Sequence, residues 1–234
     1  MPGLGTIINV AAILLGGLAG LLFGRFMTPR FQDILVKATG VCTIILGVEG
    51  AVEKMLSIDG GGTLMLIGSM ALGGVAGELI DIDHRMERFG EWLKQKTGNA
   101  RDSRFVDGFV TASLTVCIGA MAIVGAINDG IFGDYSILAA KAVLDFIIIL
   151  VMTSAMGRGC MFSAIPVGVL QGLVTLLARL IQPLMTDAAL GNLSLVGSVL
   201  IFCVGLNLVW KNTVRVANLL PAIVFAAACA FLPF

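Results

Sequence analysis

Long runs of apolar residues, separated by short polar segments, dominate this chain. A helix that crosses a hydrocarbon core of roughly 30 Å takes about 20 apolar residues. The first such run, residues 4–24, reaches that length without one charged side chain. The same pattern predicts an all-α, polytopic transmembrane helix bundle of about eight spans, at residues 4–24, 34–54, 61–80, 108–128, 136–157, 160–182, 189–210 and 216–233.

One long polar segment, at about residues 81–107, separates the third and fourth spans. Within it Ile82, Met86, Phe89 and Leu93 recur at helical spacing, with charged residues between them. An amphipathic helix on the cytoplasmic surface of the membrane accounts for this pattern, and a soluble hairpin is the alternative.

Composition agrees with a membrane protein. Of the 234 residues 58% are hydrophobic and only 13% are charged, and the mean hydropathy is +1.00. Soluble domains are nearer half apolar and a quarter charged. The 15 basic and 15 acidic residues cancel, so the chain has no global basic excess for nucleic acid. We predict a single integral membrane domain over residues 1–234, with the lipid bilayer as partner and no nucleic acid.

The distribution of basic residues sets the expected orientation. With eight spans, one side of the membrane collects 11 basic residues, namely Arg25, Arg30, Arg85, Arg88, Lys94, Lys96, Arg101, Arg104, Arg158, Lys211 and Arg215. The loops on the other side offer Lys54, with Arg179 near the end of the sixth span. Basic loops stay in the cytoplasm. Both termini are therefore predicted to lie outside it.

Catalytic and metal-binding motifs are absent from the sequence. The five cysteines occur singly, without a C-x-x-C pair, and His84 is the one histidine. Zinc and iron–sulfur sites need clustered ligands. The chain also lacks G-x-S-x-G, H-E-x-x-H and the phosphate-binding loop. We therefore expect no enzyme activity, no cofactor and no metal site.

Small residues follow one face of two predicted spans. Gly16, Gly20 and Gly24 recur at four-residue spacing in the first span, and Gly73 and Gly77 do so in the third. Such faces let another backbone approach closely. They predict packing within the chain, with a homo-oligomer interface as the alternative.

A weak internal repeat links the second and fifth spans. Residues 34–38 of the second span echo residues 137–142 of the fifth, and Gly68 and Gly168 fall at comparable places in the spans that follow. Units of three helices would then have opposite orientations, which is an inverted repeat of the kind found in transporters. Chance similarity between apolar segments is the alternative.

The most informative pair of residues is Lys141 and Asp145. They are four residues apart on one face of the fifth span, with Asp145 near its middle. An unpaired charge at that depth costs at least about 2.5–3.5 kcal/mol. One interpretation is a site where Asp145 binds a cation or proton and Lys141 is displaced or tunes its pKa. The other is a structural ion pair that locks the fifth span to its neighbours.

Other polar residues in the predicted spans suggest a polar interior. Gln171 lies near the centre of the sixth span, and Ser163 nearer its cytoplasmic end. The remaining candidates for ion or solute binding are Asn9, Ser113, Asn207 and Asn218. Each alone is explained by hydrogen bonding between helices. Near the outer face, Glu49, Asn128 and Asp129 suggest either a cation-attracting mouth or hydrated helix ends.

Several segments together resemble one family of bacterial membrane proteins. They are residues 5–9, residues 108–113, Lys141 with Asp145, residues 163–166, residues 171–172 and residues 218–222. In these the chain resembles the YqgA/YdfK group, the domain of unknown function numbered 554. The resemblance implies a multi-span protein of the bacterial inner membrane, with a role as a sodium channel or pump and a link to biofilm formation. The chain has Ala120 where proline is common in that family, which leaves a kink in the fourth span in doubt.

Two functions follow as hypotheses. The first is a channel or secondary transporter for a small cation or other small solute, with Asp145, Lys141 and Gln171 at mid-membrane. The second is a membrane scaffold or regulator that affects cell-surface behaviour such as biofilm formation and binds its partner through residues 81–107.

Overall fold

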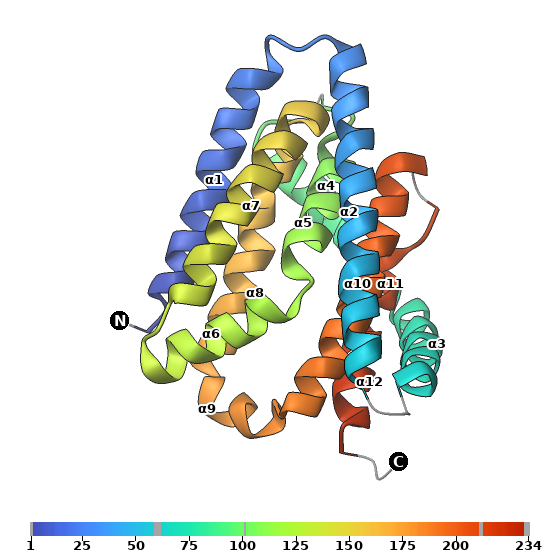
Figure 1. Cartoon of the computed structure of the whole chain (residues 1–234). Coiled ribbons are helices and arrows are strands. Elements are labelled where there is room, and N and C mark those ends of the chain that lie inside the picture. The colour runs from blue at the N-terminus through green and yellow to red at the C-terminus, as the bar shows by residue number, and fades with distance from the viewer. Residues whose placement is uncertain (1, 59–61, 101, 211–212, 232–234) are drawn as a thin grey trace. The chain divides into compact units, whose positions relative to one another are not determined.

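The computed structural model describes residues 2–58, 62–100, 102–210 and 213–231, and within these ranges helices are the only regular secondary structure. The all-α prediction is therefore confirmed. Residues 59–61, together with the basic residues Arg101 and Lys211, lie outside the described residues. The helices are labelled in Figure 1: α1 (Leu4–Gly24), α2 (Pro29–Ser57), α3 (Gly62–Ile80), α4 (Ile82–Lys96), α5 (Phe105–Cys117), α6 (Ala120–Phe132), α7 (Ser136–Met156), η1 (Arg158–Ser163), α8 (Ala164–Leu176), α9 (Ala178–Ile181), η2 (Gln182–Leu184), α10 (Asp187–Trp210), α11 (Val216–Leu219) and α12 (Pro221–Cys229).

Most of these helices have the length and composition of membrane spans. Within the described residues six segments are long and apolar enough to cross a bilayer, namely α1, α2, α3, α7, η1 with α8, and α10. The bent pair of α5 and α6 makes a seventh if it is counted as one span. The last expected span, 216–233, is a shorter apolar segment over Val216–Cys229. The predicted polytopic helix bundle is thus confirmed.

The helices group into two compact units. Unit 1 comprises residues 1–39, 86–117 and 121–181, and unit 2 comprises residues 40–85, 118–120 and 182–234. Unit 1 contains α1, α5, α7 to α9 and most of α4 and α6, whereas unit 2 contains α3, α10 to α12 and most of α2. The expected single domain and the inverted repeat of three-helix units stay predictions.

In unit 1, α1 packs along α7 through its glycine face. A Cβ atom on Gly16 would lie 2.5 Å from the Phe146 carbonyl oxygen, and one on Gly20 would lie 2.5 Å from that of Leu150. Only glycine fits such an approach of two backbones. The glycine face of α1 therefore serves packing within the chain, and a homo-oligomer stays a prediction.

The fourth expected span is broken. Helices α5 and α6 meet at an angle of 62°, and Gly119 between them has φ +139°. A side chain at this φ would be strained, so glycine permits the break. The kink that Ala120 left in doubt is present, and it forms without proline.

In unit 2, α3 packs against α11 and α12. A Cβ atom on Gly73 would lie 2.3 Å from the Ala222 backbone nitrogen, and one on Gly77 would lie 1.8 Å from the Asn218 carbonyl oxygen. Helix α10 is tied to α12 by a hydrogen bond of 3.1 Å from the Asn192 amide to the Ala226 carbonyl. Glycine thus also sets the closest packing in this unit.

Helix α4 confirms the helical interpretation of the polar segment. Its Leu93 is buried together with Phe105 and Phe109 of α5. On the exposed side the rings of Phe89 and Trp92 stack with centroids 5.7 Å apart. Its place on the membrane surface stays a prediction.

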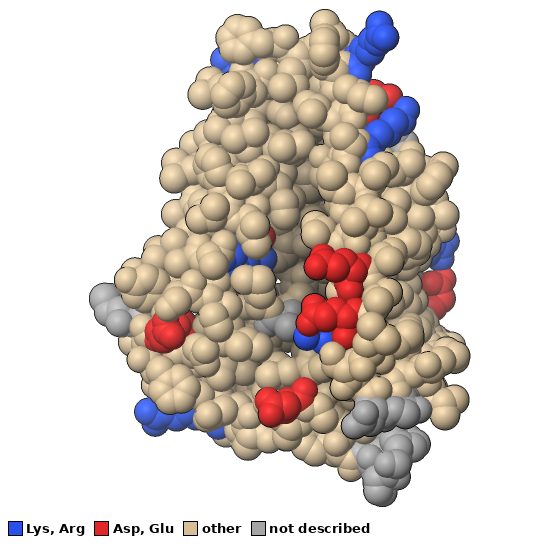
Figure 2. Space-filling view, in the orientation of Figure 1, with Lys and Arg blue, Asp and Glu red and all other residues tan. Residues whose placement is uncertain are grey.

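The molecular surface is predominantly apolar. Figure 2 shows charged side chains only in isolated groups on the face in view. Large side chains such as Leu79 and Leu176 are more than four-fifths exposed. An apolar surface of this extent belongs in lipid, because water would disfavour it.

Candidate ion-binding site

The Lys141–Asp145 pair is buried in unit 1. Lys141 Nζ donates to both carboxylate oxygens of Asp145, at 2.8 and 2.7 Å. The side chains are only 9% and 3% exposed. Asp145 lies about 14 Å from the start of α7, at 1.5 Å per residue, which is close to half of a bilayer core. The structure therefore buries both charges, with Asp145 near the middle of α7.

Two neighbouring helices bring polar atoms to this pair. The Asn9 carboxamide of α1 lies beside the Asp145 carboxylate. Neither polar atom of that carboxamide completes a hydrogen bond within the described residues. The Cys117 thiol of α5 lies within electrostatic reach of both charges. The pair is thus bordered by an amide placed to interact with the Asp145 carboxylate, and the side-chain oxygen of this amide has no partner among the described residues.

Gln171 faces the interior from α8. A Cβ atom on Gly168 would lie 3.3 Å from Val10 of α1, and further along α8 Gly172 shares a cavity with Thr6 of α1. As the residue number rises along α8 from Gly168 to Gly172, the neighbouring residue number on α1 falls from Val10 to Thr6. Helices α1 and α8 are therefore antiparallel. Gln171 consequently lies at a height between Thr6 and Asn9. It is 1% exposed, and both polar atoms of its amide lack a partner in the described part of the chain.

A cavity of about 400 Å³ opens at one end of this polar stretch. It is lined by Thr6 of α1 and by Gly172 and Thr175 of α8, with Arg179 of α9 at its edge. Both threonine hydroxyls are buried without a partner within the described residues. Thr6 is three residues from Asn9, and Thr175 is four from Gln171, so each pair shares a helix face. Polar side chains therefore continue from the cavity towards Asp145.

Buried polar atoms without partners are concentrated in one unit. Among the described residues they belong to Thr6, Asn9, Asp129, Thr153, Ser163, Gln171 and Thr175, and every one of these is in unit 1. Each such group costs about 1–3 kcal/mol when nothing satisfies it. Native proteins tolerate few of them, and those that persist usually have a function or bind water or an ion.

Asp129 has a different position from the one expected. It is 0% exposed, so it does not belong to a hydrated helix end. Its Oδ2 accepts a hydrogen bond of 2.9 Å from the Gly5 N–H at the start of α1. A carboxylate is stabilised there by the positive end of the helix dipole. Glu49, the other acid of the expected mouth, is an exposed residue of α2.

Two further predicted site residues lie in unit 1. The Ser113 hydroxyl donates to the Phe109 carbonyl of its own helix at 2.6 Å, so its hydrogen bond is local. Ser163, at the junction of η1 and α8, is fully buried and its hydroxyl has no partner among the described residues.

The two asparagines predicted in the last spans belong to unit 2 and have local roles. The Asn207 amide closes the turn after α10 by donating to Val214 O at 2.6 Å and accepting from its N–H at 2.9 Å. Asn218 Oδ1 accepts from the Asp83 N–H at 2.8 Å, and its Nδ2 donates to Glu78 at 2.7 Å. Both amides are therefore satisfied inside unit 2, whereas those of Asn9 and Gln171 are not.

The pKa of the Asp83 carboxyl, at the start of α4, is shifted by its surroundings in unit 2. Burial raises its pKa above the ordinary value near 3.8, and the Arg215 charge opposes this shift. Asp81 and Glu78 raise the pKa further, and His84 lowers it.

A raised folded-state pKa makes stability depend on pH. Protonation of Asp83 should stabilise the fold fully below pH 3.8, and this contribution should disappear as the pH rises through the raised pKa. We expect Asp83→Asn to remove that part of the pH dependence in thermal unfolding between pH 4 and 7. An unchanged profile in the variant would contradict the assignment.

Sequence reasoning missed Thr6 and Thr175. Threonine is common in membrane helices, and its hydroxyl usually bonds to its own helix, so neither residue is conspicuous alone. Their spacing could have indicated them, because Thr6 lies one helical turn from Asn9 and Thr175 lies one turn from Gln171. Within the described residues no three His, Cys, Asp or Glu side chains converge on one point.

Comparison with known proteins places the chain in a family. The family described as "Protein of unknown function (DUF554)" matches residues 4–231. The chain is 27% identical over 227 residues to the uncharacterized membrane protein YdfK of Bacillus subtilis (strain 168), covering 97% of this chain and 95% of the relative. It is 26% identical over 227 residues to the uncharacterized protein YqgA of Escherichia coli (strain K12), covering 95% and 94%. No solved structure matches the chain.

Proposed function

This chain belongs to the DUF554 family, and on that premise we propose that unit 1 transports a small ion or solute across the membrane through its buried polar side chains. The observation that carries the proposal is the Lys141–Asp145 pair, buried in α7 beside the buried Asn9 amide. Replacing both charges by apolar residues would remove the cost of burying them. Their retention is therefore better explained by function than by stability.

The chemistry of the pair suits a cation that competes with lysine. When Lys141 and Asp145 are hydrogen-bonded, the ammonium group of Lys141 neutralises the Asp145 carboxylate. This pairing lowers the cost of burying the carboxylate at bilayer depth while no other cation is bound. A small cation that reaches the carboxylate takes the place of the ammonium group. The side-chain oxygen of Asn9 can then replace part of its hydration shell, and the Gln171 amide, which also lacks a partner in the described part of the chain, offers a further polar group between the cavity and the pair.

The direct test is ion flux by purified protein in proteoliposomes. Sodium, potassium and proton gradients are imposed in turn, and uptake is followed by an ion-sensitive dye. Protein-dependent flux of at least one ion is expected. The proposal for a cation is wrong if none of the three gradients dissipates faster than in empty vesicles while reconstituted protein remains folded and inserted.

Gln171 offers a test that separates transport from stability. We expect Gln171→Met, a substitution of similar size, to keep or raise the unfolding temperature because it removes two buried polar atoms without partners. We expect the same variant to lower flux at least about tenfold, since a loss of 1.4 kcal/mol at the site corresponds to that factor. Thermal unfolding and proteoliposome flux measure the two effects.

Asn207→Leu is the variant to compare with Gln171→Met. Its amide is fully bonded within the turn after α10, so stability should fall while the flux per folded protein stays unchanged. A Gln171→Met variant with lower stability and normal flux would instead mark Gln171 as a structural residue.

Helix α4 supports the alternative of a scaffold or regulator. Phe89 and Trp92 are 41% and 52% exposed and stack on each other, which is a surface suited to a protein partner or to lipid headgroups. This alternative predicts that Phe89→Ala with Trp92→Ala abolishes the cellular phenotype while Asp145→Asn leaves it intact. Transport through unit 1 predicts instead that Asp145→Asn abolishes the phenotype and that the double variant of Phe89 and Trp92 leaves it intact.

A further inference from the structure

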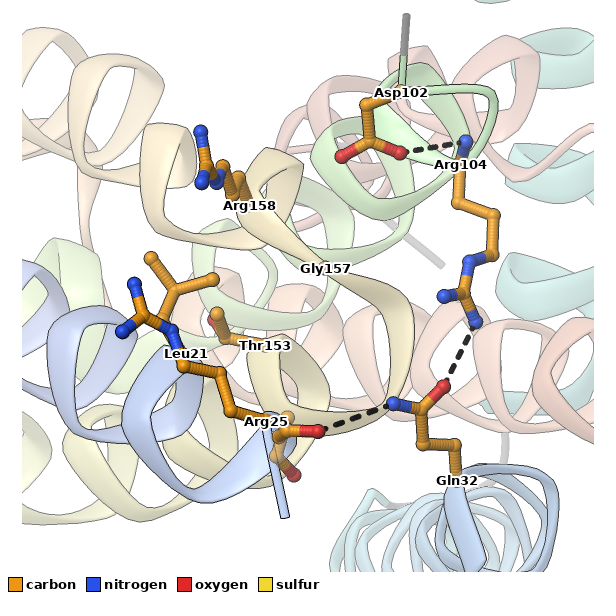
Figure 3. A pocket seen from close by; sticks show the side chains of 10 residues that line it. Leu21, Arg25, Gln32, Asp102, Arg104, Thr153, Gly157 and Arg158 are labelled. Carbon is orange, nitrogen blue, oxygen red and sulfur yellow. Dashed lines mark hydrogen bonds between the residues drawn. The ribbon is translucent and has the colours of Figure 1, made fainter. Parts of the chain in front are cut away.

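A second pocket of unit 1 is lined by arginines. Its volume is about 250 Å³, which is below the roughly 300–1,000 Å³ of typical small-molecule sites. Arg25 comes from the end of α1, Arg104 from the segment before α5, and Arg158 from η1 (Figure 3). These residues belong to the side of the membrane that the basic loops predict to be cytoplasmic.

None of the three guanidinium groups is paired with a carboxylate in the described part of the chain. Arg104 donates to the Gln32 side chain and to the Ala155 carbonyl, both at 3.2 Å. Arg158 donates to the Asn99 side chain at 3.2 Å. Arg25 has no side-chain hydrogen bond to any described residue, and it lies beside Leu21 in Figure 3. The arginines therefore retain donors and uncompensated charge.

The charge balance of the pocket favours an anion. Asp102, the one acidic residue of the lining, accepts a hydrogen bond of 3.0 Å from the Arg104 backbone N–H. The carboxyl-terminal ends of α1 and α7 add about half a negative charge each. The positive charge of the three guanidinium groups exceeds the combined negative charge of Asp102 and the two helix ends by about one unit.

The wall of the pocket carries an independent sign of a ligand. Thr153 of α7 lines it and is only 2% exposed, yet its hydroxyl has no partner among the described residues. The neighbouring Ser154 hydroxyl, by contrast, donates to the Val151 carbonyl at 2.7 Å. A hydroxyl without a partner in a pocket lined by three arginines offers a donor to an oxygen-rich anion.

We propose that this pocket binds a phosphate group, carried either by an anionic phospholipid or by a soluble phosphate. Guanidinium groups recognise phosphate by paired, charge-assisted hydrogen bonds, and three arginines from separate elements line the pocket. The Thr153 hydroxyl donates a further hydrogen bond to a phosphate oxygen. A bound headgroup would tie α1 to η1 on the basic side of unit 1. This inference does not depend on transport through Asp145.

Two binding measurements on the full chain distinguish the sources. In phosphatidylcholine nanodiscs, inorganic phosphate is titrated by calorimetry. In nanodiscs doped with phosphatidylglycerol, the lipid retained by the protein is counted by native mass spectrometry. Binding in the first arm identifies soluble phosphate, and retention in the second identifies the lipid headgroup.

The variants are chosen so that folding is preserved. Arg25→Gln and Arg158→Gln change exposed side chains, and Arg30→Gln is the matched control because it is exposed in α2 outside the pocket. We expect each pocket variant to weaken phosphate or lipid binding at least about tenfold, and Thr153→Val to weaken it several-fold. We expect no change in Arg30→Gln.

Three outcomes would overturn the proposal. They are no binding in either arm, wild-type binding in the double variant Arg25→Gln/Arg158→Gln, and an equal loss in the Arg30→Gln control. Circular dichroism and a monodisperse elution profile establish that each variant is folded.

Discussion

Asp145→Asn is expected to abolish ion flux and to lower the free energy of unfolding by about 3–5 kcal/mol. The substitution leaves the Lys141 ammonium buried, 9% exposed, without the carboxylate that holds it at 2.7 Å. Removing one partner of a buried ion pair is costly because the remaining charge is uncompensated. Flux is lost in addition because asparagine cannot neutralise a permeating cation.

The chain supplies a matched control for this variant. Lys37 and Asp33 of α2 form the same four-residue ion pair at the same 2.7 Å, but their side chains are 51% and 59% exposed. Exposed helical pairs contribute only about 0.3–0.5 kcal/mol. Asp33→Asn should therefore change neither stability nor flux to a comparable degree.

The double variant Lys141→Met/Asp145→Leu separates the two interpretations of the buried pair. Replacing a whole buried pair by apolar residues is often neutral or stabilising by about 1–4 kcal/mol. We expect stability to return to the wild-type level or above it. If the pair only joins helices, flux should return as well. If Asp145 binds the transported ion, flux should stay absent.

Thermal unfolding in detergent and flux in proteoliposomes are measured on the same four proteins. Normal flux in the double variant would rule out Asp145 as the ion-binding group. Loss of flux in the Asp33→Asn control would show that the assay responds to surface charge and does not report on the buried site.

The sequence predicts the spans of this protein well, and it also predicts the buried pair. Apolar run length alone gives α1, α3, α7 and α10 to within a few residues, because hydrocarbon thickness fixes helix length. The Lys141–Asp145 pair is equally visible, since two charges in an apolar run have few other ways to be accommodated.

Residues whose role depends on packing could not be found in this way. Asn218 and Asn9 are alike in the sequence, yet Asn218 bonds to Glu78 and Asp83 in unit 2 while Asn9 lies beside the buried Asp145 in unit 1. The difference arises from which helices are adjacent, and single-sequence periodicity does not contain that information. The sequence left the break at Gly119 in doubt for a related reason, because a glycine inside an apolar run is usually tolerated within a helix.

Gly77→Ala is expected to be the most destabilising substitution of a single methyl group in unit 2. An added Cβ atom would lie 1.8 Å from the Asn218 carbonyl oxygen, so α3 and α11 must separate. Overpacking of this kind typically costs about 1–3 kcal/mol. Separation would also stretch the 2.7 Å hydrogen bond from the Asn218 amide to Glu78, next to the Arg215–Glu78 ion pair.

Gly68→Ala on the same helix is the control, because nothing lies within 4 Å of the Cβ position there. Alanine is favoured over glycine inside a helix by about 0.5–1 kcal/mol, so this variant should be as stable as the wild type or more so. Opposite shifts in unfolding temperature for the two variants are thus expected. Equal shifts would mean that α3 and α11 do not approach through Gly77, and the close packing assigned to unit 2 would then be incorrect.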